Sequence, residues 1–198
     1  FIIDVNGSIW ATGEGASNRL GTGSQDDLNA LTKVFDENAT AIASGDGSTL
    51  FTTRNDELWG MGSLNLSGVN GQTPVKILDV NLTDFDTRSG SHYIVKSDGS
   101  LWAWGSNSKG QLGNGTFDGN NTIGLIVDAN VTQVSAGSQH AIFLKNDGSL
   151  WGMGGNNFNG HNRRLGIASP TLASTPHLII DSGVKSVSAG YSHTLFVK

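Results

Sequence analysis

The sequence of 198 residues contains no cysteine and only three prolines. Without cysteine the chain can form no disulfide, no thiolate zinc site and no cysteine nucleophile. It also lacks any run of about 20 apolar residues, so we expect no membrane span. The fold must therefore be held together by its apolar core and its hydrogen bonds.

Basic residues are scarce as well. The chain has 12 lysines and arginines against 17 aspartates and glutamates, which gives a formal net charge of -5 at pH 7. The basic residues are scattered, whereas a nucleic-acid surface needs clustered Lys and Arg to displace counterions. We therefore expect no nucleic-acid partner.

Glycine, by contrast, is abundant. The chain has 28 glycines and a hydrophobic fraction of only 36%. In a low-complexity run this composition would indicate disorder. Here the glycines recur at fixed places in turns and loops, which indicates an ordered repeat protein.

Residues 95–113 form the stretch that the rest of the chain repeats. Asp98-Gly99 separates two runs of alternating apolar residues, which predicts a hairpin with a two-residue type I′ turn. In residues 101–105, Trp102 and Trp104 alternate with small or aliphatic residues, the period of two that a strand imposes. The stretch is therefore predicted to be a hairpin followed by a glycine-rich loop.

The hairpin recurs along the chain, and each copy has a tryptophan in its second strand. These tryptophans are spaced by 49, 43 and 49 residues, a period typical of stacked or radial repeat proteins. An apolar strand precedes each copy, and residues 194–197 repeat that strand once more. The four tryptophans are Trp10, Trp59, Trp102 and Trp151. We expect each indole to be buried within its repeat.

A further strand comes before each hairpin, rich in Val or Ala, ending in Gly and leading into a His. Its clear copies are residues 131–140 and 184–193. A less well preserved copy, residues 39–45, is followed by Ser48 at the position where the histidine is expected. Each repeat then contains about four short strands, and no segment shows a helical period.

Two positions depart from this pattern. In residues 82–92, Arg88 stands near the expected glycine and His92 comes one residue late. The connection 63–71 is the most divergent loop. Asp56 is expected in the left-handed turn position that glycine usually fills, and residues 73–77, which include a proline, are expected to form an edge strand.

These motifs resemble the repeat of the regulator of chromosome condensation family, of a bacterial type. The resemblance rests on the Ser-Ala-Gly-x-x-His strand, the Asp-Gly-Ser-Leu-Trp hairpin, the Trp-Gly-x-Asn loop and the Gly-Gln-Leu-Gly turn at residues 110–113. It implies an all-β fold, a β-propeller of about four blades with four short antiparallel strands each, as a partial ring or a segment of a larger one. The chain is then one propeller segment, 1–198, with repeats at about 1–30, 31–72, 73–121 and 122–169, and residues 170–198 starting the next blade. The strand at 31–35 is expected to lead into the second blade.

The histidines at 92, 140 and 193 suggest a metal site, since three imidazoles can ligate zinc or iron. We favour a structural role. One histidine per repeat, at one phase, lies in a different blade from the others and can pin a neighbouring loop. The Asp-Gly-Ser turns lack the spaced oxygens of a calcium loop and are explained as tight turns. We therefore expect no metal and no cofactor.

The loop at residues 155–169 is the one local anomaly. The interval from Trp151 to Leu165 is 14 residues, against 10 from Trp102 to Leu112, an insertion of four. Loops that exceed their counterparts often carry binding residues. The candidate binding residues are Phe158, His161, Arg163 and Arg164. The alternative is an ordinary solvated loop.

Three functions stay open at this point. The first, which we favour, is a non-catalytic protein- or glycan-binding module of a secreted or surface protein. The resemblance implies it, since relatives act as exchange factors, ubiquitin-ligase parts and β-lactamase inhibitors through surface contacts. The second is a structural repeat that self-associates through its end strands into a ring, fibre or surface layer. The third is an enzyme with a channel-mouth active site, for which no convergent residues are found. The phases of Phe1 and Lys198 within the repeat lead us to expect a segment of a longer protein.

Overall fold

The computed structural model describes the chain except residues 37, 159–160, 163 and 169. Its described part is built from short strands, with one turn of 3-10 helix, η1 (Ala16–Asn18). The first half contains β1 (Ile2–Ile3), β2 (Ile9–Gly13), β3 (Leu28–Phe35), β4 (Ala39–Ser44), β5 (Ser48–Thr53), β6 (Glu57–Gly62), β7 (Gly71–Asp79), β8 (Leu82–Arg88) and β9 (Ser91–Lys96). The second half contains β10 (Leu101–Gly105), β11 (Asn120–Val127), β12 (Val131–Ala136), β13 (His140–Lys145), β14 (Leu150–Gly155), β15 (Asn157–Phe158), β16 (His161–Asn162), β17 (Leu172–Ile180), β18 (Ser186–Ala189) and β19 (Thr194–Val197).

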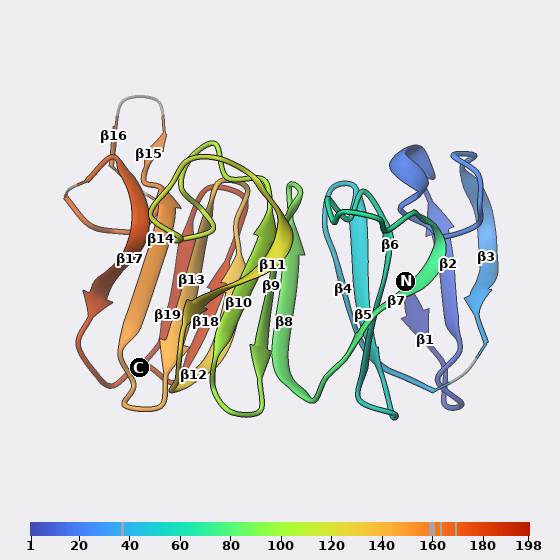
Figure 1. The fold of residues 1–198 in the computed structure, drawn as a ribbon, viewed down its shortest axis with the longest axis horizontal. Coiled ribbons are helices and arrows are strands. Elements are labelled where there is room, and N and C mark those ends of the chain that lie inside the picture. Colours follow the sequence, from blue (N-terminus) through green and yellow to red (C-terminus); the bar gives the residue numbers. More distant parts are fainter. Residues whose placement is uncertain (37, 159–160, 163, 169) are drawn as a thin grey trace.

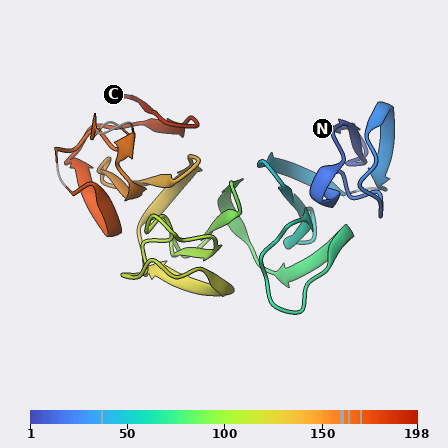
Figure 2. The ribbon, with the colours of Figure 1, turned by 90° about the horizontal axis from the view of Figure 1, so that it is seen from above.

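The strands form a row of antiparallel sheets (Figure 1). Three described sheets have four strands each, in the orders β4-β5-β6-β7, β8-β9-β10-β11 and β12-β13-β14-β17. They are flanked by β1-β2-β3 and by β18-β19, and β15-β16 is a small separate hairpin. We number the sheets along the chain, from β1-β2-β3 as the first, through these three as the second, third and fourth, to β18-β19 as the last. Seen from above, the sheets follow an arc, with β4, β8 and β12 on its inner side and β3, β7, β11 and β17 on its outer side (Figure 2). This arrangement of blades is that of a β-propeller segment and confirms the predicted fold class.

The sheets are offset from the predicted sequence repeats. The strand expected at residues 31–35 to lead into the second blade is part of β3, which pairs with β2 of the first sheet, Trp10 opposite Lys33. The outer strand therefore completes the preceding sheet, because it returns directly from the loop that follows the Leu-Trp strand. The edge position of β7, which contains Pro74, is confirmed by the strand order.

The central hairpin turn differs from the prediction. The N–H of Gly99 donates to Lys96 O at 2.8 Å, the N–H of Lys96 donates to Ser100 O at 3.0 Å, and Gly99 has φ 80°. This is a three-residue loop closed by a left-handed glycine rather than a two-residue type I′ turn. The extra residue lets Asp98 Oδ1 accept the Ser100 N–H at 2.9 Å. Asp56, with φ 56°, occupies the left-handed position as predicted.

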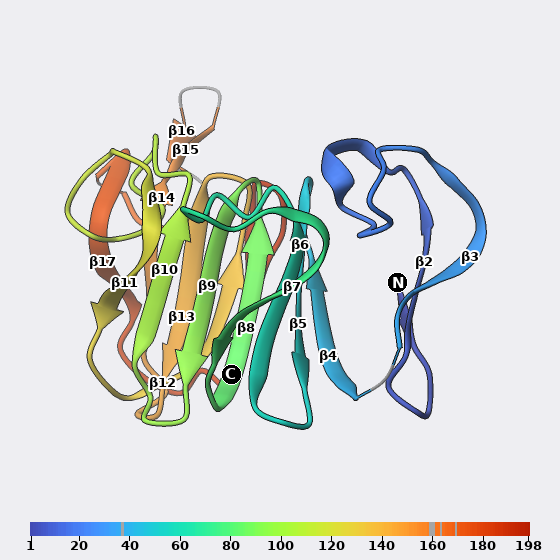
Figure 3. The same ribbon diagram turned by 45° about the vertical axis from the view of Figure 1, so that its right-hand side comes forward.

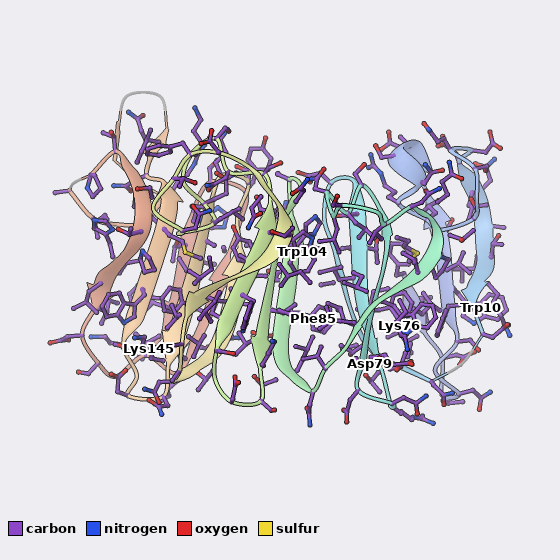
Figure 4. The ribbon with its side chains drawn as sticks, viewed as in Figure 1. Trp10, Lys76, Asp79, Phe85, Trp104 and Lys145 are labelled. Carbon is purple, nitrogen blue, oxygen red and sulfur yellow. The ribbon has the colours of Figure 1, made fainter. Side chains whose placement is uncertain are left out.

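The core lies between neighbouring sheets. One cluster joins Tyr93 of the third sheet, and Leu112 of the loop that follows β10, to Phe143 and Met153 of the fourth sheet. The repeated indoles are a correction to the prediction: Trp10, Trp59, Trp102 and Trp151 are only half-buried. The fully buried indole is the fifth, Trp104, between the two central sheets (Figure 4).

Each half-buried indole donates a hydrogen bond from its Nε1 to a side chain of its own hairpin. Trp102 Nε1 donates to Ser100 Oγ at 2.8 Å, and Lys96 Nζ lies 3.9 Å from the centre of the Trp102 rings. Trp151 repeats this arrangement with Ser149 and Lys145. These tryptophans therefore rigidify the hairpins as well as covering the core.

Candidate functional site

The two ends of the sheets differ in the length of their connections. At one end the strands are joined by long connections, residues 14–27, 63–70, 106–119 and 156–171. We call this end the loop face. The opposite end, the hairpin face, carries the tight Asp-Gly turns and the short links between sheets (Figures 1 and 3). Long loops held on rigid sheets are where binding residues concentrate.

Two of the long connections are each anchored by a buried asparagine, Asn107 in one and Asn156 in the other. Asn107 Oδ1 accepts the Leu112 N–H at 2.9 Å, while its Nδ2 donates to Thr116 O and Asp118 O, both at 3.0 Å. Asn156 does the same in the next sheet, accepting from Leu165 N–H at 3.1 Å. One amide side chain thus holds both arms of each loop, which is the role of the Asn in the Trp-Gly-x-Asn motif. These two loops of the loop face are therefore held in fixed conformations.

The predicted binding residues lie in the fourth sheet's long connection. Phe158 and His161 are paired in the strand register of the β15–β16 hairpin. Arg163 lies outside the described residues. Arg164 is buried, with 5% of its surface exposed, and its Nη1 donates to Gln139 Oε1 at 2.7 Å. Burial lowers the pKa of Arg164. Binding by these four residues stays a prediction.

Arg164 borders a cleft that the sequence pattern did not indicate. The cleft measures about 460 Å³ and lies between the third and fourth sheets, with Lys109 on one wall and Gln139, Arg164 and Thr171 on the other. Its walls come from separate repeats, so no local motif contains them together. The insertion itself was the only available signal.

A larger cleft lies at the neighbouring seam, by which we mean the contact between two successive sheets, here the second and the third. It measures about 700 Å³ and is bordered by residues 63–69 of the second sheet and by residues 105–106 and 119–121 of the third. Close by, the exposed Phe117 stands on the 106–119 connection with 47% of its surface accessible. The sequence marks residues 63–71 as divergent but assigns no binding role to them.

The histidines do not share one phase, contrary to the prediction. In the strand register His140 lies opposite Gly154, whereas His92 lies opposite Trp104 and Ser91 takes the His140 position, opposite Gly105. His92 is therefore on the other face of its strand, where its ring stacks on Trp104 with centroids 5.0 Å apart. The turn from Arg88 to Ser91 has the same length as the turn from Gly137 to His140, so Ser91 takes the histidine position and His92 falls one residue beyond it.

Both buried histidines are neutral at physiological pH. Burial lowers the pKa of His92 to about 3 and that of His140 to about 4. His92 Nδ1 lies 2.8 Å from Thr87 Oγ1, and His140 Nε2 lies 3.4 Å from Thr194 Oγ1. These contacts suit loop-fixing side chains. Within the described part of the chain, no three His, Cys, Asp or Glu side chains lie close enough to hold a metal ion.

The inner strands carry two half-buried carboxylates. Asp84 Oδ2 accepts the Val134 N–H and Asp86 Oδ2 accepts the Ala136 N–H, both at 2.8 Å, from the inner strand of the next sheet. Burial raises the pKa of both carboxyls. Both come from β8, and both bind backbone amides across a seam. Their geometry is that of structural links between blades.

No helix among the described residues has the length and apolar character needed to cross a membrane.

Two parts of the chain match a known repeat. Residues 98–144 and residues 131–160 match the regulator of chromosome condensation (RCC1) repeat. The chain is also 32% identical over 133 residues to the E3 ubiquitin-protein ligase HERC2 of Homo sapiens, and equally to that of Mus musculus. This match covers 58% of the chain but only 3% of either ligase.

Solved structures show the same fold. The Prp20p structure from Saccharomyces cerevisiae, described with its binding properties to Gsp1p and histones, superposes with a TM-score of 0.79 at 18% identity, covering 98% of this chain and 52% of that one. Yeast RCC1 (Prp20) bound to Kap60 gives 0.79 at 17% identity over 96% and 49% of the two chains. Human WBSCR16 gives 0.77 at 16% identity over 91% and 52%. The chain thus spans about half the length of these structures.

Proposed function

We propose that this chain, which carries repeats of the regulator of chromosome condensation family in a β-propeller segment, is a non-catalytic module that binds a protein partner through its loop face. The observation that carries the proposal is the asymmetry between the two ends of the sheets. Long connections lie at one end only, and two of them are fixed by Asn107 and Asn156. The structurally similar proteins support it, since yeast RCC1 (Prp20) was solved with Kap60 bound and Prp20p has binding properties to Gsp1p and histones.

The absence of catalysis is part of this proposal. An active site at the mouth of the central axis would need ionisable side chains that converge from several blades. The carboxylates described there, Asp84 and Asp86, belong to one strand and accept backbone N–H groups. The buried histidines are likewise engaged with threonine hydroxyls. The further proposal that the protein is secreted or lies on the cell surface is based on its Asn-rich, Lys-poor and cysteine-free composition. Cell fractionation tests it.

The test uses the chain as immobilised bait with two matched variants. Phe117→Asp places a charge on an exposed apolar residue of the loop face, and Val5→Asp, at a residue 93% exposed, does so on the hairpin face. Proteins retained by the wild type are identified by mass spectrometry. We expect a partner that is retained by Val5→Asp and lost from Phe117→Asp. A partner lost only from Val5→Asp would refute the loop face as the binding surface.

A second candidate is self-association at the β18–β19 sheet. Leu195 and Val197 of β19 are more than half exposed, and Phe196 is nearly so, an unusually apolar surface for a strand. A second copy of the chain would cover them. Light scattering tests this: a dimer or larger species that Leu195→Lys converts to a monomer supports it, and a monomeric wild type refutes it.

A further inference from the structure

The second sheet has the shortest loop-face connection. Residues 63–70 make eight residues between β6 and β7, whereas the corresponding connections at 14–27 and 106–119 have 14 each and the one at 156–171 has 16. The loop face is therefore uneven, because the loop beside the third sheet is shorter than its counterparts.

Two of the longer connections, 14–27 and 106–119, seal the contact with the next sheet through a Leu-Gly turn. Gly113 lies so close to Met153 of the next sheet that an added Cβ would be 2.2 Å from its Sδ. Gly21 lies against Met61 in the same way, at 2.3 Å. The turn glycine thus permits the loop to rest directly on a methionine of the following sheet.

The seam below the short connection is sealed differently. Trp104 occupies the register position that Met61 and Met153 hold in their sheets. Its larger indole fills the seam, and its Nε1 donates to Leu64 O at 2.9 Å. Leu64 is itself buried, at 2% exposure. The seam's interior is therefore closed, while the outer space that a longer loop would occupy remains as the cleft of about 700 Å³.

The cleft has fixed walls. Ser67 N–H donates to Asn121 O at 2.9 Å, which ties the second sheet's connection to the third sheet. Asn65 Nδ2 donates to Gly90 O at 2.9 Å across the same seam. A cleft whose walls are bonded together before binding loses little conformational entropy when it is filled.

The lining has a distinct chemistry. Its residues are Ser63, Leu64, Asn65, Leu66, Ser67, Val69, Gly105, Ser106, Gly119, Asn120 and Asn121. None of these is charged, although the chain carries a net charge of -5. None is aromatic. A charged group entering the cleft would lose hydration without gaining a counter-charge from the lining, and a sugar ring would find no aromatic ring in it to stack on.

We propose that this cleft binds an extended, uncharged peptide segment of the protein partner. The inference rests on the proposed function and gives the partner's chemistry at this seam. Amides and hydroxyls of the lining satisfy the peptide's backbone groups, while Leu66 and Val69 receive aliphatic side chains. The volume is within the range of pockets that enclose ligands. Strand β11, an outer edge strand, begins at Asn120 beside the cleft. The Asn121 carbonyl there already accepts the Ser67 N–H, so side-chain amides and hydroxyls of the lining are the partners left for the peptide backbone.

The test selects ligands from a phage library of random short peptides and measures their affinity for matched variants. Ser67→Trp fills the cleft from an exposed lining residue, and Ser182→Trp makes the same change at an exposed residue on the hairpin face. We expect uncharged peptides to be enriched, and their affinity to fall at least tenfold in Ser67→Trp while Ser182→Trp is unchanged. If Ser67→Trp fails to fold by circular dichroism, Asn121→Arg introduces a charge into the lining and is expected to give the same loss.

Three results would overturn the proposal. Selected peptides could be consistently charged, or could bind Ser67→Trp as well as the wild type. A neutral oligosaccharide array could also bind the wild type and lose binding in Ser67→Trp where no peptide does. If either peptide result occurs while the captured partner still depends on Phe117, the cleft assignment fails and the loop-face function stands.

Discussion

The ring of His140 lies directly against Gly137. A Cβ on this glycine would be 2.1 Å from Cε1 of the ring, a distance that real atoms do not tolerate. Gly190 and His193 repeat the relationship in the last sheet, at 2.2 Å. In the third sheet the histidine position is taken by Ser91, and a large residue, Arg88, stands in the glycine position. A histidine at this position therefore requires the glycine, whereas the glycine also occurs without it, as Gly45 with Ser48 shows.

This pairing predicts a coupled pair of substitutions. Gly137→Ala is expected to lower the free energy of unfolding by about 2 kcal/mol or more in the wild type, because the new methyl group overlaps the His140 ring. In a His140→Ser background the same change should cost much less, since the ring is gone. Urea denaturation of the four proteins measures the coupling. Equal costs in both backgrounds would show that the ring does not lie over the glycine.

Asp86 is expected to be a main link between the third and fourth sheets. Its carboxylate accepts the Ala136 N–H of β12 and the Thr87 N–H of its own strand, both at 2.8 Å. Asp86→Ala leaves both donors without this acceptor, and each such loss costs about 1–3 kcal/mol. We expect denaturation to show a destabilisation of about 2–6 kcal/mol. Asp181→Ala, at an exposed residue, is the control and should stay within about 0.5 kcal/mol of the wild type; equal effects of the two changes would contradict the link.

Acid should destabilise the fold through its buried histidines. Burial lowers the pKa of His140 to about 4, below the value of about 6.5 in the unfolded chain. The unfolded state thus takes up protons first, and the free energy of unfolding falls as the pH drops from about 6.5 toward the folded pKa, by about 1.4 kcal/mol per pH unit for this histidine. Denaturation curves recorded from pH 7 to pH 5 should show a weaker pH dependence in His140→Gln than in the wild type. His177→Gln serves as control, and an unchanged slope in His140→Gln would contradict the prediction.

The two kinds of tryptophan should respond differently to truncation. Trp104 is fully buried, so Trp104→Ala is expected to cost about 3–5 kcal/mol. Trp102 is half-buried beneath Lys96, and Trp102→Ala should cost only about 1–2 kcal/mol. Thermal and urea unfolding of both variants measure the difference. A larger loss of stability for Trp102→Ala than for Trp104→Ala would contradict the conclusion that Trp104 is the main buried indole of this sheet.

The architecture could be predicted from the sequence because each repeat shows the two-residue period of strands and glycines at the same turn positions. The recurring tryptophans located the hairpins, and Asp56 was correctly placed in a left-handed turn. The hairpin turn type was wrong because Asp98 and Gly99 alone do not reveal the third loop residue. The histidine register was wrong because Arg88 replaces the glycine by which the copies were aligned.

The cleft beside Leu64 could not have been predicted in the same way. It depends on a connection that is short only in comparison with its neighbours, and on Trp104, which lies in another repeat and donates to Leu64 O. For Arg164 the sequence indicated the residue but not its surroundings. The insertion drew attention to it, but its burial against Gln139 depends on the packing of the neighbouring loop.

Hydrogen exchange measured by mass spectrometry, on the chain alone and with the purified partner that the bait experiment retains, tests the central claim most directly. The account predicts slower exchange on binding in the loop-face connections, above all in residues 63–70 and 106–119. Slower exchange confined to the turns of the hairpin face, around residues 97–100 and 146–149, would contradict it.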